Sequence, residues 1–134
     1  MKYFFSESKS VDPEELNTLF VDVGWGQNST EQLQQSIDAY PFVAHARIDT
    51  GLLVGYVSAF SDEVFYTMLG ELLVHPNYQR QGIAANLLAR VEARFPSAPV
   101  YIKALGEAKS FFVAHGYKSP STGLTVLFKS ATSA

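Results

Sequence analysis

The sequence predicts an α/β (α+β) fold, with a mixed, mostly antiparallel sheet of six to seven strands flanked by about four helices. Short apolar runs between turn residues predict antiparallel strands in the middle of the chain. Helical apolar spacing that alternates with short runs predicts crossovers in the second half. The 134 residues, of which 47% are hydrophobic, suit one domain over residues 1–134, with a disordered tail at residues 130–134.

Two helices are expected after a short first strand over residues 2–5. The first helix begins with Asp12 as N-cap, Pro13 at the first position and Glu15 as the capping-box partner. The second helix begins near Ser29 and places its apolar residues on one face. Both helices precede the main run of strands.

The remaining elements alternate in a way that predicts a sheet with helical crossovers. Gly70 lies inside the longest strand-like run, where a glycine indicates a bulge or the close approach of another chain or a ligand. The expected elements are strands over residues 42–48, 52–60 and 64–74, a helix from residue 83 to residue 95, a strand over residues 100–104, a helix over residues 107–115, and one or two late strands from Tyr117 and over residues 124–129.

Composition excludes several classes of function. The net charge of −3 without a Lys/Arg cluster argues against a nucleic-acid partner. The chain has no cysteine, its three histidines are far apart, and we expect no metal site. No apolar run approaches a membrane span, and the start lacks a signal-peptide pattern, so a cytoplasmic protein without a membrane partner is expected.

The stretch NYQRQGIAANLL, residues 77–88, places Gly82 at the entrance of a predicted helix. The first N–H groups of a helix lack internal partners, and the helix dipole adds partial positive charge, so this turn could hold a phosphate. Arg80 could add a charge-assisted hydrogen bond. The alternative is a glycine that only opens a helix, since neither familiar nucleotide-binding loop is present.

Two motifs resemble the GNAT N-acetyltransferase superfamily. Residues 72–84 resemble its acetyl-CoA signature, a strand, a turn and Q/R-x-x-G-x-G/A, with Gln79, Gly82 and Ala84 at the fixed positions. The run AKSFFVAHGY at residues 108–117 resembles the family's late helix, commonly A-x-x-F-Y-x-x-x-G-F. Chain length and element order also match this GNAT-like fold.

The resemblance implies that the chain binds acetyl-CoA. The strand at residues 72–74 would separate from the strand near Val100, pantetheine would lie between them, and a backbone N–H at Leu73 would stabilise the oxyanion. The implied contacts with the cosubstrate come from Leu72, Leu73, Val74, Gln79, Arg80, Gln81, Gly82, Ile83, Ala84, Ala85, Phe111 and Phe112.

Glu71 is the candidate general base. An alkylamine with a pKa near 10.4 is neutral in only about one molecule in 2,500 at pH 7, so the enzyme must accept a proton. The family often places an acidic residue at this point of the signature strand. The alternative is a solvent-facing strand carboxylate.

The general acid is open. The family's usual proton donor is a tyrosine where this chain has Phe112, which cannot donate a proton. Tyr66, Tyr101 or Tyr117 could substitute, although each also suits a core or sheet position. A thiol pKa near 8.5 makes thiolate a tolerable leaving group without an acid.

The loop between the first two helices borders the acceptor site in this fold, and it holds Trp25. Trp25 could stack on an aromatic or cationic acceptor, or it could pack the two helices together. Tyr40, Phe65 and Tyr66 could line the same pocket.

These features predict an acetyl-CoA-dependent N-acetyltransferase that moves an acetyl group directly to the primary amine of a small molecule. The absence of cysteine and of a Ser-His-Asp arrangement fits direct transfer. The alternatives are a CoA-binding sensor or interaction protein without turnover, a protein or peptide N-acetyltransferase, and a nucleotide-binding module. The sequence does not name the acceptor, and an exposed late strand could support a homodimer.

Overall fold

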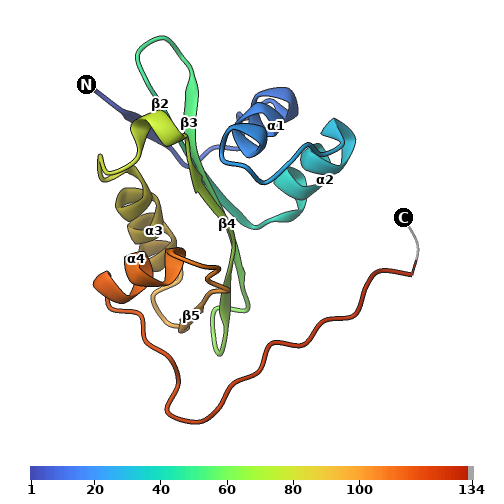
Figure 1. The fold of residues 1–134 in the computed structure, drawn as a ribbon, viewed down its shortest axis with the longest axis vertical. Coiled ribbons are helices and arrows are strands. Elements are labelled where there is room, and N and C mark those ends of the chain that lie inside the picture. The colour runs from blue at the N-terminus through green and yellow to red at the C-terminus, as the bar shows by residue number, and fades with distance from the viewer. Residues whose placement is uncertain (133–134) are drawn as a thin grey trace. The chain divides into compact units, whose positions relative to one another are not determined.

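The computed structural model of the chain describes residues 1–132 and has two compact units, Met1–Lys103 and Ala104–Ala134. The first unit holds the sheet, three of the four α-helices and a short 3-10 helix, and the second holds one α-helix followed by chain without regular structure up to residue 132. The elements, in chain order, are β1 (Phe4–Ser6), α1 (Pro13–Asp22), α2 (Thr30–Ala39), β2 (Phe42–Arg47), β3 (Leu53–Ser61), β4 (Thr67–Val74), the 3-10 helix η1 (Pro76–Tyr78), α3 (Ile83–Arg94), β5 (Val100–Tyr101) and α4 (Ala108–Ala114) (Figure 1).

The strands form one five-stranded sheet in the order β1-β2-β3-β4-β5. The pairings from β1 to β4 are antiparallel, and β5 pairs with β4 in parallel. A parallel pair needs a crossover, and α3 supplies it between β4 and β5. The predicted mixed, mostly antiparallel sheet with four α-helices is confirmed over residues 1–132.

The predicted strand count of six to seven is wrong. The described residues from Tyr117 to residue 132 contain no strand, so neither the late strand at Tyr117 nor the one over residues 124–129 forms. Leu127 and Phe128 are 86% and 89% exposed. Apolar and aromatic residues favour a strand only where a neighbouring strand offers packing and hydrogen bonds, and this segment has no strand partner here. The expected disorder of residues 130–134 falls partly on residues 133 and 134, which lie outside the described part.

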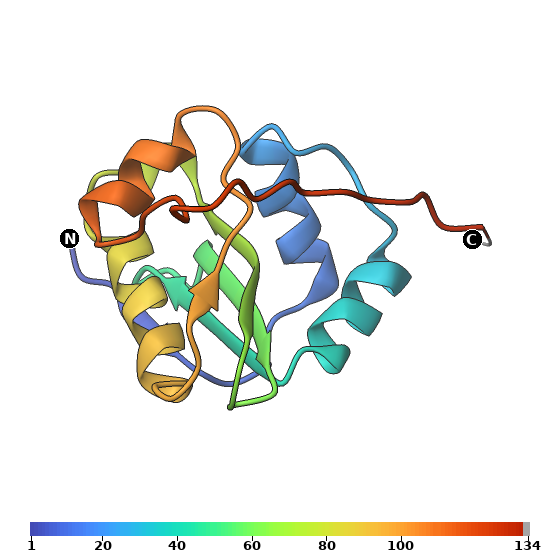
Figure 2. The ribbon, with the colours of Figure 1, turned by 90° about the horizontal axis from the view of Figure 1, so that it is seen from below.

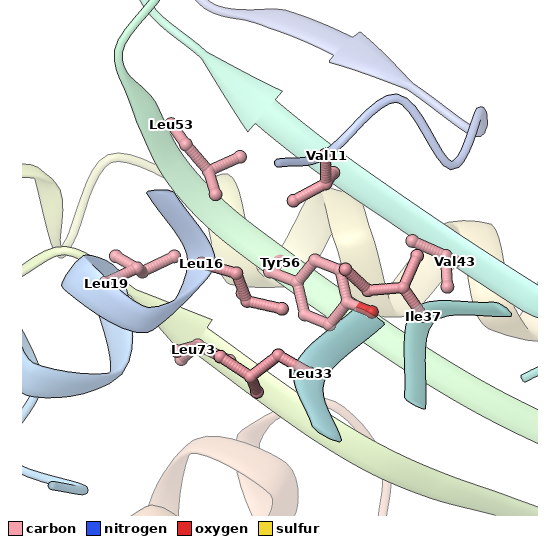
Figure 3. Close-up of a cluster of buried hydrophobic side chains, with 9 residues drawn as sticks. All are labelled: Val11, Leu16, Leu19, Leu33, Ile37, Val43, Leu53, Tyr56 and Leu73. Carbon is pink, nitrogen blue, oxygen red and sulfur yellow. The ribbon is translucent and has the colours of Figure 1, made fainter. Parts of the chain in front are cut away.

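The two faces of the sheet are covered by different helices, α1 and α2 on one side and α3 on the other (Figures 1 and 2). Figure 3 shows the core on the α1/α2 side, where Tyr56 of β3 lies among leucine and isoleucine side chains of the two helices. Full burial of each such side chain stabilises the fold by roughly 1.5–3 kcal/mol. The core residues on this side are Val11, Leu16, Leu19, Leu33, Ile37, Val43, Leu53, Tyr56 and Leu73.

No helix in residues 1–132 has both the length and the apolar composition that crossing a bilayer requires.

Glu15 joins α1 to the sheet as well as capping it. The predicted capping box is confirmed: the Asp12 N–H donates to Glu15 Oε2 at 2.9 Å, and Asp12 caps the helix in return. The same carboxylate accepts two hydrogen bonds from the Arg47 guanidinium of β2, at 2.7 and 2.6 Å. The Arg47 hydrogen bonds hold the pKa of Glu15 below its ordinary value.

α3 packs close to the sheet at Gly55. A methyl group at this position would lie 2.8 Å from Ile83 Cγ2 and 3.2 Å from Leu87 Cδ1. Ile83 and Leu87 are both buried, so neither side chain has free space in which to move away. Glycine is therefore required for the helix to approach the strand this closely.

We predict that Gly55→Ala lowers the free energy of unfolding by about 1–3 kcal/mol, because the added methyl group overpacks the α3 interface. Urea unfolding followed by circular dichroism measures the effect. Gly123→Ala is the control, since a Cβ there would meet nothing within 4 Å. A midpoint for Gly55→Ala equal to that of the unchanged protein would show that α3 does not pack as described.

We also predict that Glu15→Gln lowers the melting temperature at pH 7, through loss of about 1 kcal/mol of charge-assisted hydrogen bonding. A depressed folded-state pKa gives stability that is present above the unfolded-state pKa and lost as pH falls through the folded-state pKa. The difference between variant and parent should therefore shrink below about pH 4.5. Glu7→Gln, in the more exposed ion pair with Arg90, should have a smaller effect. A Glu15→Gln difference that does not change with pH contradicts the assignment.

Candidate active site

A β-bulge interrupts the pairing of β3 with β4. Val57 pairs with Leu72 and Ala59 pairs with Leu69, so Gly70 and Glu71 together lie opposite Ser58. The bulge predicted from Gly70 is confirmed. Bulges redirect side chains and free backbone groups from the ladder, and they are common beside active sites.

Ser58 hydrogen-bonds the groups that the bulge exposes. Its Oγ donates to Glu71 Oε2 and accepts from the backbone N–H of Glu71 at 2.9 Å. Ser58 is fully buried and Glu71 is half-buried. The carboxylate is therefore held in one orientation by a buried hydroxyl, which a freely solvated strand carboxylate is not.

Tyr40, at the C-terminal end of α2, completes this group. A Cβ at Gly70 would overlap both the Tyr40 hydroxyl and Ser58 Oγ, so a glycine at this position leaves the space that these groups fill. Burial, and next the negative charge of Glu71, raise the pKa of Tyr40, against the effect of its hydrogen bond with Ser58. The Tyr40 hydroxyl consequently stays protonated and can donate a hydrogen bond near neutral pH.

Tyr56 lies beside these groups on the core side. Burial, followed by the charge of Glu71 and by Tyr40, raises the pKa of Tyr56. Ser58 was missed by the reasoning from sequence, because it stands in an apolar strand and bears no motif. The signal that could have found it is the register between the predicted strands over residues 52–60 and 64–74, which places Ser58 opposite Gly70 and Glu71.

The turn between β4 and α3 is open at the entrance of α3. Arg80 and Gly82 have positive φ angles of 64° and 84°, and no side chain caps the helix at Gly82. A Cβ at Gly82 would meet nothing within 4 Å. Gln79 Nε2 donates to the Val74 carbonyl at 3.1 Å, which ties the turn to the end of β4.

The far edge of β4 lies unpaired beside this turn. β5 pairs with β4 only at Thr67–Val100 and Met68–Tyr101. Residues 72–74 pair with β3 and, within residues 1–132, have no strand partner on their other edge. This arrangement agrees with the separation of the two strands expected from the resemblance.

Three of the residues predicted at the acceptor site, Tyr40, Trp25 and Phe65, differ in their surroundings. Tyr40 is the one that interacts with the Ser58–Glu71 pair in the described part of the chain. Trp25 packs edge-on against Phe20, with ring centroids 5.6 Å apart, and is 52% exposed. Phe65 is 78% exposed in the turn before β4, where its N–H donates to Asp62 Oδ1 at 2.9 Å.

Phe111 and Phe112 lie on α4 in the second unit. Their ring centroids are 5.1 Å apart, and the Phe112 and Tyr117 rings are 5.6 Å apart. The predicted helix is confirmed, and Gly116 follows it with a φ of 91°. Among residues 1–132 there is no group of three or more His, Cys, Asp or Glu side chains that could hold a metal ion.

Residues 10–124 match the family model described as "Acetyltransferase (GNAT) domain". This match covers most of the 134 residues. The chain belongs to the GNAT acetyltransferase family. The predicted family is thereby confirmed.

A curated relative and a solved structure agree with this assignment. The relative is an uncharacterized ycf52-like N-acetyltransferase from Prochlorococcus marinus, 24% identical over 98 residues, which are 66% of this chain and 51% of the relative. The chain thus spans about half the length of the curated relative. A GNAT family acetyltransferase from Streptococcus pneumoniae has the same fold, with a TM-score of 0.78, 24% identity, and coverage of 96% of this chain and 100% of that one.

Two more distant structures show which proteins share the fold. One is an aminoglycoside 6'-N-acetyltransferase complexed with coenzyme A, with a TM-score of 0.61, 18% identity, and coverage of 74% of this chain and 60% of that one. The other is a ribosomal-protein alanine N-acetyltransferase from Escherichia coli, with a TM-score of 0.67, 15% identity, and coverage of 86% and 76%. At these identities the likeness concerns the fold alone.

Proposed function

We propose that this GNAT-family protein is an acyltransferase that moves an acetyl group from acetyl-CoA directly to the primary amine of a small molecule. The observation that carries the proposal is the Glu71 carboxylate, held by buried Ser58 at the β4 bulge. This carboxylate lies on the strand that leads into the open turn at Gly82.

The open turn suits the pyrophosphate of acetyl-CoA. Uncapped N–H groups at the start of α3, from residue 82 to residue 85, are suited to an anionic ligand. Gly82 has open space in front of it, and the small side chains of Ala84 and Ala85 keep the first turn narrow. Arg80 is exposed in the same turn and adds positive charge. Gln79 positions the turn through its hydrogen bond to Val74.

The unpaired edge of β4 suits the pantetheine arm. The His75 N–H donates to the Val54 carbonyl of β3 at 2.8 Å, and N–H groups alternate in direction along a strand, so the Leu73 N–H also faces β3 while the Leu72 and Val74 N–H groups face the free edge. The Leu72 and Val74 N–H groups are therefore assigned to the pantetheine arm and the thioester carbonyl oxygen, in place of the Leu73 N–H expected from the resemblance. Bound acetyl-CoA supplies the thioester: the amine nitrogen forms the amide bond, the carbon–sulfur bond breaks, and the sulfur carries the electron pair away.

Glu71 accepts the proton that the acceptor ammonium must lose before its nitrogen can react. Ser58 acts as a positioning residue, because its hydroxyl fixes one carboxylate oxygen. Tyr40 in turn hydrogen-bonds Ser58 and stays protonated. Phe112 has no proton to donate to the sulfur. Because a thiol pKa near 8.5 permits departure as thiolate, the mechanism needs no acid from α4.

We predict that Gly82→Trp raises the KM for acetyl-CoA at least tenfold, because an indole would block the helix N–H groups, and each charge-assisted hydrogen bond contributes about 1.5–3 kcal/mol. Initial rates at varied acetyl-CoA measure it. Gly51→Trp controls for backbone strain, since Gly51 also has a positive φ of 90° and open space. An unchanged KM for Gly82→Trp refutes the phosphate-binding turn.

We predict that Glu71→Gln lowers kcat by about 10²-fold or more and flattens its rise with pH, because the proton acceptor is lost. Ser58→Ala should lower kcat less and leave the KM for acetyl-CoA unchanged, because it frees the carboxylate without removing it. Glu31→Gln, an exposed carboxylate at the start of α2, is the control. If Glu71→Gln keeps full activity across the pH range, Glu71 is not the base.

The function as a whole is tested by following free-thiol release with acetyl-CoA and a panel of small amines and peptides. Turnover on a small amine supports the proposal. Turnover on peptide N-termini alone replaces it with a protein N-acetyltransferase, and binding of acetyl-CoA without any turnover replaces it with a CoA-binding sensor. Absence of CoA binding refutes both enzyme and sensor.

A further inference from the structure

Four aromatic rings form a continuous row on the first unit, starting at the candidate active site. Ring centroids lie 6.1 Å apart for Tyr40 and Phe60, 6.5 Å apart for Phe60 and Tyr66, and 5.0 Å apart for Tyr66 and Tyr101. The last two rings are stacked, with planes 27° apart. We call Tyr40, Phe60, Tyr66 and Tyr101 the aromatic row.

The sheet register places the row and the candidate base on one face. Phe60 pairs with Met68, and Met68 pairs with Tyr101, so their side chains project from the same face. Ser58 precedes Phe60 by two positions on β3 and shares this face. Tyr40 connects the two, because its ring contacts Phe60 while its hydroxyl lies beside Ser58.

The rings are exposed to an unusual degree for neighbouring aromatic residues. Phe60, Tyr66 and Tyr101 are 42%, 39% and 39% exposed. A single exposed aromatic side chain is ordinary, but adjacent rings form an apolar patch, and such patches mark binding surfaces. This patch is continuous with the Ser58–Glu71 pair through Tyr40.

The charged groups at the two ends of the aromatic row favour an amine with one cation and an aromatic ring over an amine with two cations. Glu71 offers a carboxylate to an ammonium group at one end. In the turn before β4, which carries Tyr66, Glu63 already pairs with Arg94 at 3.3 Å, and Asp62 Oδ1 accepts three backbone N–H groups. Asp62 keeps its negative charge but is exposed, so solvent screens its attraction for a second cation of an acceptor, whereas an aromatic ring can stack on the row.

We propose that the acceptor is an arylalkylamine, with its ammonium group at Glu71 and its ring on the aromatic row. The transfer step rests on the proposed function: the ammonium gives one proton to Glu71, the nitrogen–carbon bond forms, the carbon–sulfur bond breaks and the electron pair leaves with the sulfur. The second nitrogen proton, released as the amide forms, goes to the departing thiolate or to solvent. Binding of the amine to the row does not depend on turnover, so the two claims can fail separately.

The test compares 2-phenylethylamine, 2-cyclohexylethylamine, spermidine and an alanyl peptide as acceptors. 2-Phenylethylamine should have the highest kcat/KM. Phe60→Ala and Tyr66→Leu should raise its KM about five- to tenfold while changing the KM for spermidine less than twofold. Tyr66→Leu keeps apolar volume in case truncation unfolds the protein. Phe4→Ala is the control, since Phe4 is 48% exposed on β1 at the opposite edge of the sheet.

Saturation-transfer NMR with CoA present measures binding of 2-phenylethylamine without turnover. Binding that Tyr66→Leu weakens supports the row even if no amine is acetylated, an outcome that would overturn only the proposed function. Two results overturn the row: turnover of spermidine or the peptide at equal or higher kcat/KM, and equal losses for aromatic and non-aromatic amines in Phe60→Ala and Tyr66→Leu. Undetectable binding of 2-phenylethylamine to the folded protein overturns it as well.

Discussion

The hydrogen bonds between Ser58 and Glu71 are the interaction on which the proposed site depends. The bulge places Gly70 and Glu71 opposite a single residue of β3, so the ladder cannot pair every backbone group. Ser58 accepts the Glu71 N–H and donates to the Glu71 carboxylate. Without this hydroxyl, part-buried polar groups would lack a partner, at a cost of about 1–3 kcal/mol each. The same contact thus stabilises the bulge and orients the candidate base.

Packing on both faces of the sheet holds the elements around the Ser58–Glu71 hydrogen bonds in place. On the α1/α2 side, the buried leucine and isoleucine side chains fix α2, and α2 ends at Tyr40, whose hydroxyl reaches Ser58. On the other side, Gly55 allows α3 to approach the sheet, which brings the Gly82 turn to the end of β4. The two glycines Gly55 and Gly70 act by omitting a side chain, and each leaves space that another residue fills. The positions of Tyr40, of the Gly82 turn and of the Ser58–Glu71 pair therefore all depend on close packing against β3 and β4.

Much of the fold could be predicted from local sequence, because its signals are local. The Asp12–Glu15 capping box, the helical periodicity after Gly82 and the bulge at Gly70 all depend on neighbouring residues, and all are present. Whether the late strands predicted from Tyr117 and over residues 124–129 form could not be predicted from local sequence. Apolar and aromatic residues at 124–129 have strand propensity, but a strand also needs a partner, and partners are set by tertiary structure.

The candidate site was predictable in part for the same reason. The motif at residues 79–84 led to the open turn, and its strand led to Glu71. Ser58 and the aromatic row depend on strand register, which brings together residues from β3, β4, β5 and the end of α2. Phe65 was predicted to line the acceptor pocket from its type and position; it lies 78% exposed in a turn that Asp62 organises, and its contact with an acceptor stays a prediction.

A crystal structure of the protein with CoA and a bound amine tests the central claim most directly. The predicted result has the pyrophosphate on the N–H groups of residues 82–85 and the amine nitrogen within hydrogen-bonding distance, about 2.6–3.2 Å, of the Glu71 carboxylate or of one water held by it. The Ser58–Glu71 hydrogen bond should be intact in that complex. An amine bound away from Glu71, or a pyrophosphate bound away from the Gly82 turn, would contradict the proposed site.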